Sequence, residues 1–195
     1  MPDVIALDIG GVCLKLHPEK TFAALGLTET TPLPVEFTAL TDMLERGMIT
    51  GNEWLIVFRH LTGNKFSGKE LRSAWGMIIG EAIEGMPELA RELVEAGYKL
   101  VFFSDTSEIH MQEVYRKLPF ANLVTGCILS YEVGHKKPDR KMYAAFEKEY
   151  GKPVFYVDDH SANVESGERC GWNSHHFTTA ENMRKTLEEM NILGN

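Results

Sequence analysis

Four short apolar runs, each followed by an acidic or hydroxyl residue, constrain this chain more than any other feature. The runs are Val4 to Leu7 before Asp8, Leu100 to Phe103 before Ser104, Cys127 to Leu129 before Ser130, and Val154 to Val157 before Asp158. Unbroken apolar runs of this length are typical of strands buried on both faces, as in a parallel sheet.

Helical patterns separate these runs. Apolar residues recur at helical spacing between residues 87 and 97, 108 and 118, 138 and 150, and 161 and 170, with glycine or proline near most ends. Residues 173–177 are predicted to form a further strand, and residues 180–190 a closing helix. Strands that alternate with helices predict an α/β fold, a doubly wound parallel sheet of the Rossmann-like type.

Residues 14–86 break this alternation. They contain no clear strand, and they show helical patterns over 18–25, 35–48, 52–61 and 69–83, separated by turn-rich segments. We therefore predict a helical cap, residues 14–86, inserted into a core formed by residues 1–13 and 87–195. Such a cap would cover the carboxyl ends of the strands, where open α/β sheets bind their ligands.

Composition narrows the range of partners. The 195 residues carry a formal net charge of −8, and no cluster of basic residues is dense enough to bind a phosphate backbone. We expect no nucleic-acid partner and no membrane partner, and the sequence does not fix an oligomeric state. Three widely spaced cysteines and an N-terminus unlike a signal peptide predict a reducing, cytoplasmic location.

Polar groups at the strand ends carry the chemistry. In a parallel sheet Asp8, Ser104 and the pair Asp158 and Asp159 would face one rim, and Lys137 lies in the loop after the third run. Carboxylates gathered at one point repel unless a cation joins them, and oxygen ligands together with a phosphate suit Mg²⁺. A carboxylate can attack phosphorus, while a hydroxyl and an ammonium can hold phosphoryl oxygens.

These motifs resemble the haloacid dehalogenase-like superfamily. Its pattern is a strand followed by D-x-D-G-[TV], a strand followed by Ser or Thr, a Lys, and a strand followed by an acidic pair. The matching stretches here are Asp8 to Val12, Ser104, Lys137 before Pro138, and Asp158-Asp159. The resemblance covers the whole chain. Within the superfamily, the chain is similar to the helical-capped branch that resembles sugar-phosphate phosphatases.

The resemblance implies a Mg²⁺-dependent phosphatase that acts on a small phosphorylated metabolite. Asp8 would attack phosphorus and form an aspartyl-phosphate. Mg²⁺ would bind Asp8, the backbone carbonyl of Gly10, and the acidic pair, with Asp159 as the expected direct ligand and Asp158 as its partner.

The phosphoryl group would be held at the ends of the first two motifs. Ser104, the backbone N–H of Asp105 and the backbone N–H of Gly11 would donate to it, and Lys137 would bridge the nucleophile and the phosphate. Lys137 is preferred to Lys136 because the lysine of the family immediately precedes proline.

The chain departs from the family pattern at Gly10, where most family phosphatases carry a second Asp that transfers a proton to the leaving group. General acid–base help accelerates such steps by roughly 10²–10⁴-fold. Gly10 therefore leaves two alternatives open. One is a metal-independent 2-haloacid dehalogenase, and the other is an impaired relative that only binds a phosphorylated metabolite. Asp105 or a residue of the cap is a candidate substitute for the missing acid.

Overall fold

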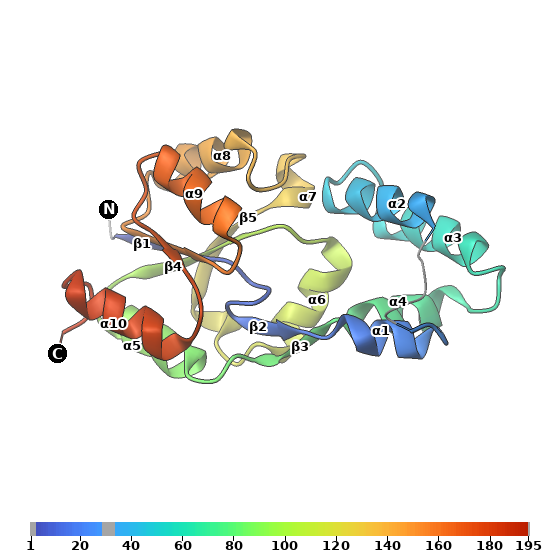
Figure 1. Cartoon of the computed structure of the whole chain (residues 1–195), viewed down its shortest axis with the longest axis horizontal. Helices are drawn as coiled ribbons and strands as arrows, with labels where there is room; N and C mark the ends of the chain where they lie inside the picture. The colour runs from blue at the N-terminus through green and yellow to red at the C-terminus, as the bar shows by residue number, and fades with distance from the viewer. Residues whose placement is uncertain (1–2, 29–33, 195) are drawn as a thin grey trace.

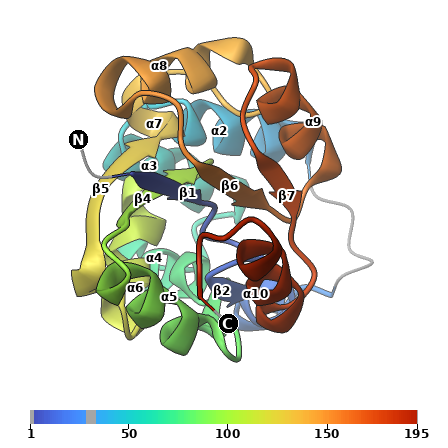
Figure 2. The same ribbon diagram turned by 90° about the vertical axis from the view of Figure 1, so that its left-hand side faces the viewer.

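The computed structural model describes residues 3–28 and 34–194. Its core is a parallel sheet with helices on both faces (Figures 1 and 2). In the described residues five strands lie in the order β5-β4-β1-β6-β7, and each neighbouring pair is parallel. They are β1 (Val4–Leu7), β4 (Lys99–Ser104), β5 (Val124–Leu129), β6 (Phe155–Asp158) and β7 (Ser174–His176). The predicted doubly wound α/β fold is confirmed.

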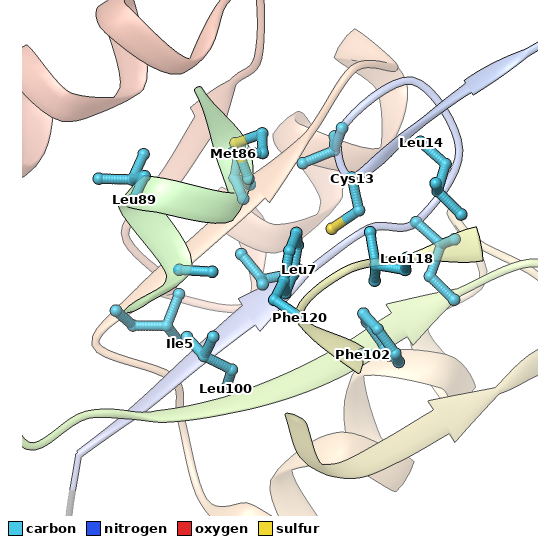
Figure 3. Close-up of a cluster of buried hydrophobic side chains, with 14 of the residues drawn as sticks. Ile5, Leu7, Cys13, Leu14, Met86, Leu89, Leu100, Phe102, Leu118 and Phe120 are labelled. Carbon is cyan, nitrogen blue, oxygen red and sulfur yellow. The ribbon is translucent and has the colours of Figure 1, made fainter. Parts of the chain in front are cut away.

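The apolar runs are unbroken because both faces of the sheet are buried. In β1, Ile5 and Leu7 belong to a first hydrophobic cluster on one face of the sheet, whereas Val4 and Ala6 belong to a second cluster on the other face. The side chains of a strand alternate between faces, so every position needs an apolar residue. Figure 3 shows the first cluster, with Leu7 among its labelled side chains.

The helices of the core follow the predicted order. Those on the face of the first cluster are α5 (Met86–Glu95), α6 (Glu108–Lys117) and α10 (Ala180–Glu189), and those on the other face are α8 (Arg140–Tyr150) and α9 (Ser161–Arg169). Two short elements that the sequence did not predict are η1 (Ala121–Leu123) and α7 (Ser130–Val133). No helix within the described ranges is long and apolar enough to cross a membrane.

Four helices form the inserted segment: α1 (Pro18–Ala24), α2 (Val35–Glu45), α3 (Gly51–Leu61) and α4 (Gly68–Gly76). They enclose a separate hydrophobic cluster that contains Trp54, Phe58 and Trp75. Both α3 and α4 begin with a capping box, in which a hydroxyl side chain and a glutamate satisfy the first backbone N–H groups. Ile109 of α6 also belongs to this cluster, so the inserted helices pack directly on the core, and the division into core and cap stays a prediction.

The prediction that residues 14–86 contain no strand is wrong. β2 (Leu14–Leu16) and β3 (Ile79–Ala82) pair antiparallel where the chain crosses between the core and the inserted helices. The predicted helix over 69–83 correspondingly ends at Gly76. Local periodicity could not reveal this pair, because each strand is short and its partner lies more than 60 residues away in the sequence.

His110 of α6 connects the core to the inserted helices. Its ring stacks on Trp75 of α4 with centroids 4.9 Å apart, and its Nε2 donates to the Trp75 carbonyl over 3.3 Å. The side chain is buried, and this desolvation lowers the pKa of His110 from 6.5 to about 4, although the hydrogen bond to Trp75 opposes the shift.

We expect this buried histidine to make the fold sensitive to acid. Because its pKa is lower in the folded chain, the unfolded chain binds more protons between pH 6.5 and about 4. Stability is therefore lost as pH falls through this window, by about 3 kcal/mol in all at 1.36 kcal/mol per pH unit. Chemical denaturation across pH 4–7 should show a shallower loss in His110→Gln than in the wild type. The same substitution at the exposed His60 is the control, and equal slopes in all three proteins would contradict the expectation.

Candidate active site

The predicted site residues meet at the carboxyl end of the sheet. Asp8 directly follows β1, Ser104 ends β4, and Asp158 ends β6. β4 and β6 lie on either side of β1, so these ends are neighbours. Carboxylate oxygens of Asp8, Asp158 and Asp159 lie within 4.8 Å of one another.

Lys137 joins two of these carboxylates. Its Nζ lies 2.9 Å from Asp8 Oδ1 and 2.5 Å from Asp158 Oδ2, and it donates to the Phe103 carbonyl over 2.9 Å. These three partners use the three protons of the ammonium group. The side chain is only 1% exposed, so the charge has left water and depends on these contacts. Lys136, the neighbouring residue, contacts the inserted helices instead.

Asp158 is saturated by protein donors. Its Oδ2 accepts from Lys137 and, over 2.6 Å, from the Tyr156 hydroxyl. Its Oδ1 accepts from the backbone N–H of His160 over 2.9 Å and from the Asn163 amide over 3.0 Å. An ionised carboxylate has about four acceptor positions. Asp158 therefore serves as a fixed counter-charge and has little capacity left for a further ligand.

Sequence reasoning missed the donors that fix Asp158. Tyr156 lies two residues before it on the same strand, so both side chains point to one face of the sheet. Asn163 lies in the first turn of α9. The position of Tyr156 on the strand is a weak signal for a donor to Asp158, because many strands carry tyrosine for packing alone. The position of Asn163 in the first turn of the next helix is an equally weak signal.

Burial and neighbouring charges shift the pKa values of Asp8 and Asp158, the two carboxylates that contact Lys137, in opposite directions. Burial raises the pKa of Asp8 to about 6, and the neighbouring Asp158 adds to the rise, while Lys137 and a hydrogen bond from Ser104 oppose it. Burial works against ionisation of Asp158 too, yet Lys137 and Tyr156 hold its pKa below the ordinary value. Burial also opposes the charge of Lys137, but Asp8 and Asp158 raise its pKa.

Asp159 differs from Asp158 because it retains an unpartnered oxygen. Its Oδ1 is buried and has no hydrogen-bond partner among the described residues. Its Oδ2 lies against Gly11, where an added Cβ would come within 2.2 Å. Gly11 also has a φ of 74°, in the left-handed region that favours glycine. The backbone N–H of His160 donates to the Asp158 carboxylate and not to that of Asp159. The His176 ring donates from Nε2 to the backbone carbonyl of Asp159 over 2.8 Å.

One predicted phosphate donor does not fit this geometry. The backbone N–H of Gly11 donates to the Leu14 carbonyl over 2.9 Å, within the turn that follows β1. Gly11 instead provides the space that the Asp159 carboxylate occupies. The other predicted residues lie together: Ser104 is buried beside Asp8, and the Asp105 carboxylate accepts from the backbone N–H of Lys137 over 2.9 Å. Burial raises the pKa of Asp105, with Lys137 opposing the shift.

The arrangement provides a buried carboxylate, Asp8, between a hydroxyl, an ammonium and a second acid with a free oxygen. A carboxylate in this position can act as a nucleophile, and the neighbouring donors can stabilise negative charge that develops on an incoming group.

The chain belongs to the family of haloacid dehalogenase-like hydrolases, whose family pattern it matches over residues 2–171. This match confirms the resemblance seen in the strand-end motifs. A search of curated proteins gave no match.

Solved structures share this fold. A HAD family enzyme from Bacteroides thetaiotaomicron in a magnesium complex is 21% identical, with a TM-score of 0.82 over 95% of this chain and 98% of that one. The wild-type form of the same enzyme, in complex with magnesium and inorganic phosphate, is 22% identical, with a TM-score of 0.77 over 92% and 96%. A predicted HAD-like family hydrolase from Porphyromonas gingivalis is 20% identical, with a TM-score of 0.75 over 98% of each chain.

Proposed function

We propose that this hydrolase is a Mg²⁺-dependent phosphatase that acts on a small phosphorylated metabolite through an aspartyl-phosphate at Asp8. A sugar phosphate is one candidate for this substrate. One observation carries the proposal. Three carboxylates converge within 4.8 Å, Lys137 pairs with two of them, and Asp159 retains a buried oxygen without a partner. A buried acidic group of this kind fits a divalent cation.

The residues present fit Mg²⁺. Asp8, Asp159 and the backbone carbonyl of Gly10 would hold the ion, and Asp158 would act as a partner that fixes Lys137. Because the four acceptor positions of Asp158 are already used, Asp159 is the better direct ligand. When bound, Mg²⁺ would offset the negative charge of the phosphoryl group and of Asp8. The magnesium and phosphate bound by the Bacteroides relative support this choice.

The protein residues divide the reaction between them. Asp8 would attack phosphorus as the ester P–O bond breaks, and the leaving oxygen would take its proton from Asp105 or from solvent. Water would then attack the phosphorus of the aspartyl-phosphate and give its proton back to the same group, which releases inorganic phosphate and restores the Asp8 carboxylate. Ser104 and the backbone N–H of Asp105 would bind the phosphoryl oxygens, and Lys137 would keep Asp8 oriented and offset charge. Gly10 supplies no proton, so a good leaving group or Asp105 must compensate.

A metal-independent 2-haloacid dehalogenase explains Gly10 but gives the free oxygen of Asp159 no task. A phosphometabolite-binding protein without turnover also explains Gly10, and it keeps the metal and phosphate contacts. The two rivals differ in measurable ways, because the first releases halide in the presence of EDTA and the second binds phosphate analogues without releasing product.

The central test is a phosphate-release panel with Mg²⁺ that includes sugar 1- and 6-phosphates. We expect Asp8→Asn to lose roughly 10³-fold or more of the activity, because an amide is not a nucleophile toward phosphorus. Equal release by the wild type and Asp8→Asn would refute the mechanism. A panel with no turnover, together with binding of BeF₃⁻, would favour the binding protein, and halide release in EDTA would favour the dehalogenase.

The two acids after β6 should respond differently to the same substitution. Asp159→Asn removes a ligand, so we expect the Mg²⁺ concentration for half activation to rise by about tenfold or more. Asp158→Asn should shift it less, but should destabilise the fold by about 3 kcal/mol, because it leaves the buried ammonium of Lys137 with one carboxylate partner, Asp8, in place of two. Mg²⁺ titration and thermal unfolding measure the two effects, and the reverse ranking in the titration would overturn the ligand assignment.

Restoring an acid at Gly10 should help poor leaving groups. An added Cβ would lie 3.0 Å from Leu16 Cδ1, and Leu16 is 46% exposed, so this side chain has room to move. Gly10→Asp should raise turnover of alkyl phosphates by about 10²-fold, the lower end of general acid catalysis. Gly10→Asn has nearly the same size and cannot donate an acidic proton, so it is the matched control. Equal rates in both variants would show that another residue already supplies the proton.

A further inference from the structure

The catalytic groups are closed off from solvent. Asp8 is 6% exposed, Ser104 2% and Lys137 7%. The side chain of Asp8 is only 9% exposed, so the site in this arrangement offers a phosphorylated compound little access. The inserted helices cover this end of the sheet, and they are tied to the core by the chain crossings at β2 and β3 (Figure 1).

The inserted helices also touch α6, where Trp75 packs on His110 and the Gly51 N–H donates to Glu108 over 2.9 Å, and they touch the core at a further place near α7. Figures 1 and 2 show α2 beside α7, on the side of the molecule opposite β2. Here Gly47, just after α2, approaches the core so closely that an added Cβ would lie 2.0 Å from the Tyr131 carbonyl oxygen. Gly47 has a φ of 63°, so glycine is required both for the turn and for the contact.

An ion-pair cluster bridges the contact near α7. Lys136 Nζ forms a short ion pair with Glu45 and lies 3.5 Å from Asp42 Oδ1. Asp42 Oδ2 in turn accepts from Arg46 Nε over 2.8 Å. Three of these four residues come from the end of α2, and Lys136 comes from the core loop after α7.

This ion-pair cluster is better placed to stabilise the contact between α2 and the core than a fully exposed pair would be. The Lys136 side chain is 25% exposed and that of Glu45 is 22% exposed, so water screens them only in part. By contrast, Lys185 and Glu189 of α10 are 74% and 65% exposed and lie 3.9 Å apart. Burial opposes the charge of Lys136, yet Glu45 raises its pKa above the ordinary value.

Lys136 also immediately precedes Lys137, whose backbone N–H donates to Asp105 over 2.9 Å and whose ammonium contacts Asp8. The contact between α2 and the core and the lysine of the site therefore lie at adjacent positions of one loop.

We propose that Lys136 is a positioning residue, and that its ion pairs with Glu45 and Asp42 form a latch that holds the inserted helices closed over Asp8. The crossings at β2 and β3 act as the hinge, and the latch lies across the site from them. Breaking the latch shifts the population toward an open form in which the strand ends are exposed. The consequence for turnover rests on the proposed phosphatase function, whereas the latch itself does not.

Amide hydrogen exchange tests the latch without any assumption about activity. We expect exchange in the peptides that cover residues 42–49 and 130–137 to rise about fivefold in Lys136→Met and in Glu45→Gln. Lys136→Arg should keep the wild-type exchange because it keeps the charge. Lys185→Met is the matched control, since it removes a lysine from an ion pair within α10 that bridges nothing.

Two further measurements decide whether the two side chains act through each other. The double variant Lys136→Met with Glu45→Gln should exchange no faster than either single variant, because the first substitution already breaks the pair. In 1 M NaCl, where screening acts over about 3 Å, the wild type should approach Lys136→Met. Additive increases in the exchange of the double variant would overturn the latch. Exchange in Lys136→Met no faster than in the control Lys185→Met would overturn it too.

Kinetics with p-nitrophenyl phosphate and Mg²⁺ then address turnover. Lys136→Met should raise KM about fivefold and change kcat less than twofold, and Lys136→Arg should restore KM, because Lys136 acts on closure and not on the bond that breaks. Absence of phosphatase activity in every protein would refute the proposed function, and the exchange data would still decide the latch. A fall in kcat with KM unchanged would contradict a role in closure.

Discussion

The ammonium group of Lys137 lies between Asp8 and Asp158, and the rest of the site depends on this contact. All three of its protons are used, by the two carboxylates and the Phe103 carbonyl, in a place almost without solvent. Breaking a buried ion pair by removing one partner costs about 3–5 kcal/mol, so loss of Lys137, which would leave both Asp8 and Asp158 without their ammonium partner, should be strongly destabilising. The site therefore requires that the end of β1, the end of β6 and the loop after α7, which supply the three charged groups, lie next to one another in the fold.

The sheet satisfies this requirement through its strand order. β1 is central among the strands that carry the site, with β4 on one side and β6 on the other, and all run in the same direction. The carboxyl ends of the three strands consequently form one short row. Apolar side chains on both faces of β1 fix its height between the helical layers, so Asp8 emerges at the rim and stays buried there.

Two adjacent acids do different work because their surroundings differ. Asp158 is held by Lys137, Tyr156, Asn163 and a backbone N–H, and its pKa lies below the ordinary value. Asp159 rests against Gly11 and keeps one unpartnered oxygen, and burial raises its pKa. The first carboxylate is committed to contacts within the protein, and the second is the one that we propose as a cation ligand. The two adjacent lysines also differ, because Lys137 lies in the site and Lys136 forms an ion pair with Glu45 of α2.

The sequence by itself determined the alternation of the five core strands with the long core helices along the chain, the convergence of Asp8, Ser104, Lys137 and the acidic pair, and the family. These follow from local apolar patterns and from residues at strand ends. Only the tertiary structure decided the pairing of β2 with β3, the engagement of the Gly11 N–H by Leu14, and the donors that saturate Asp158. Each of these depends on contacts between segments whose relative placement no local pattern encodes, since hydrogen bonds and burial are satisfied in space and only then assign a role to each side chain.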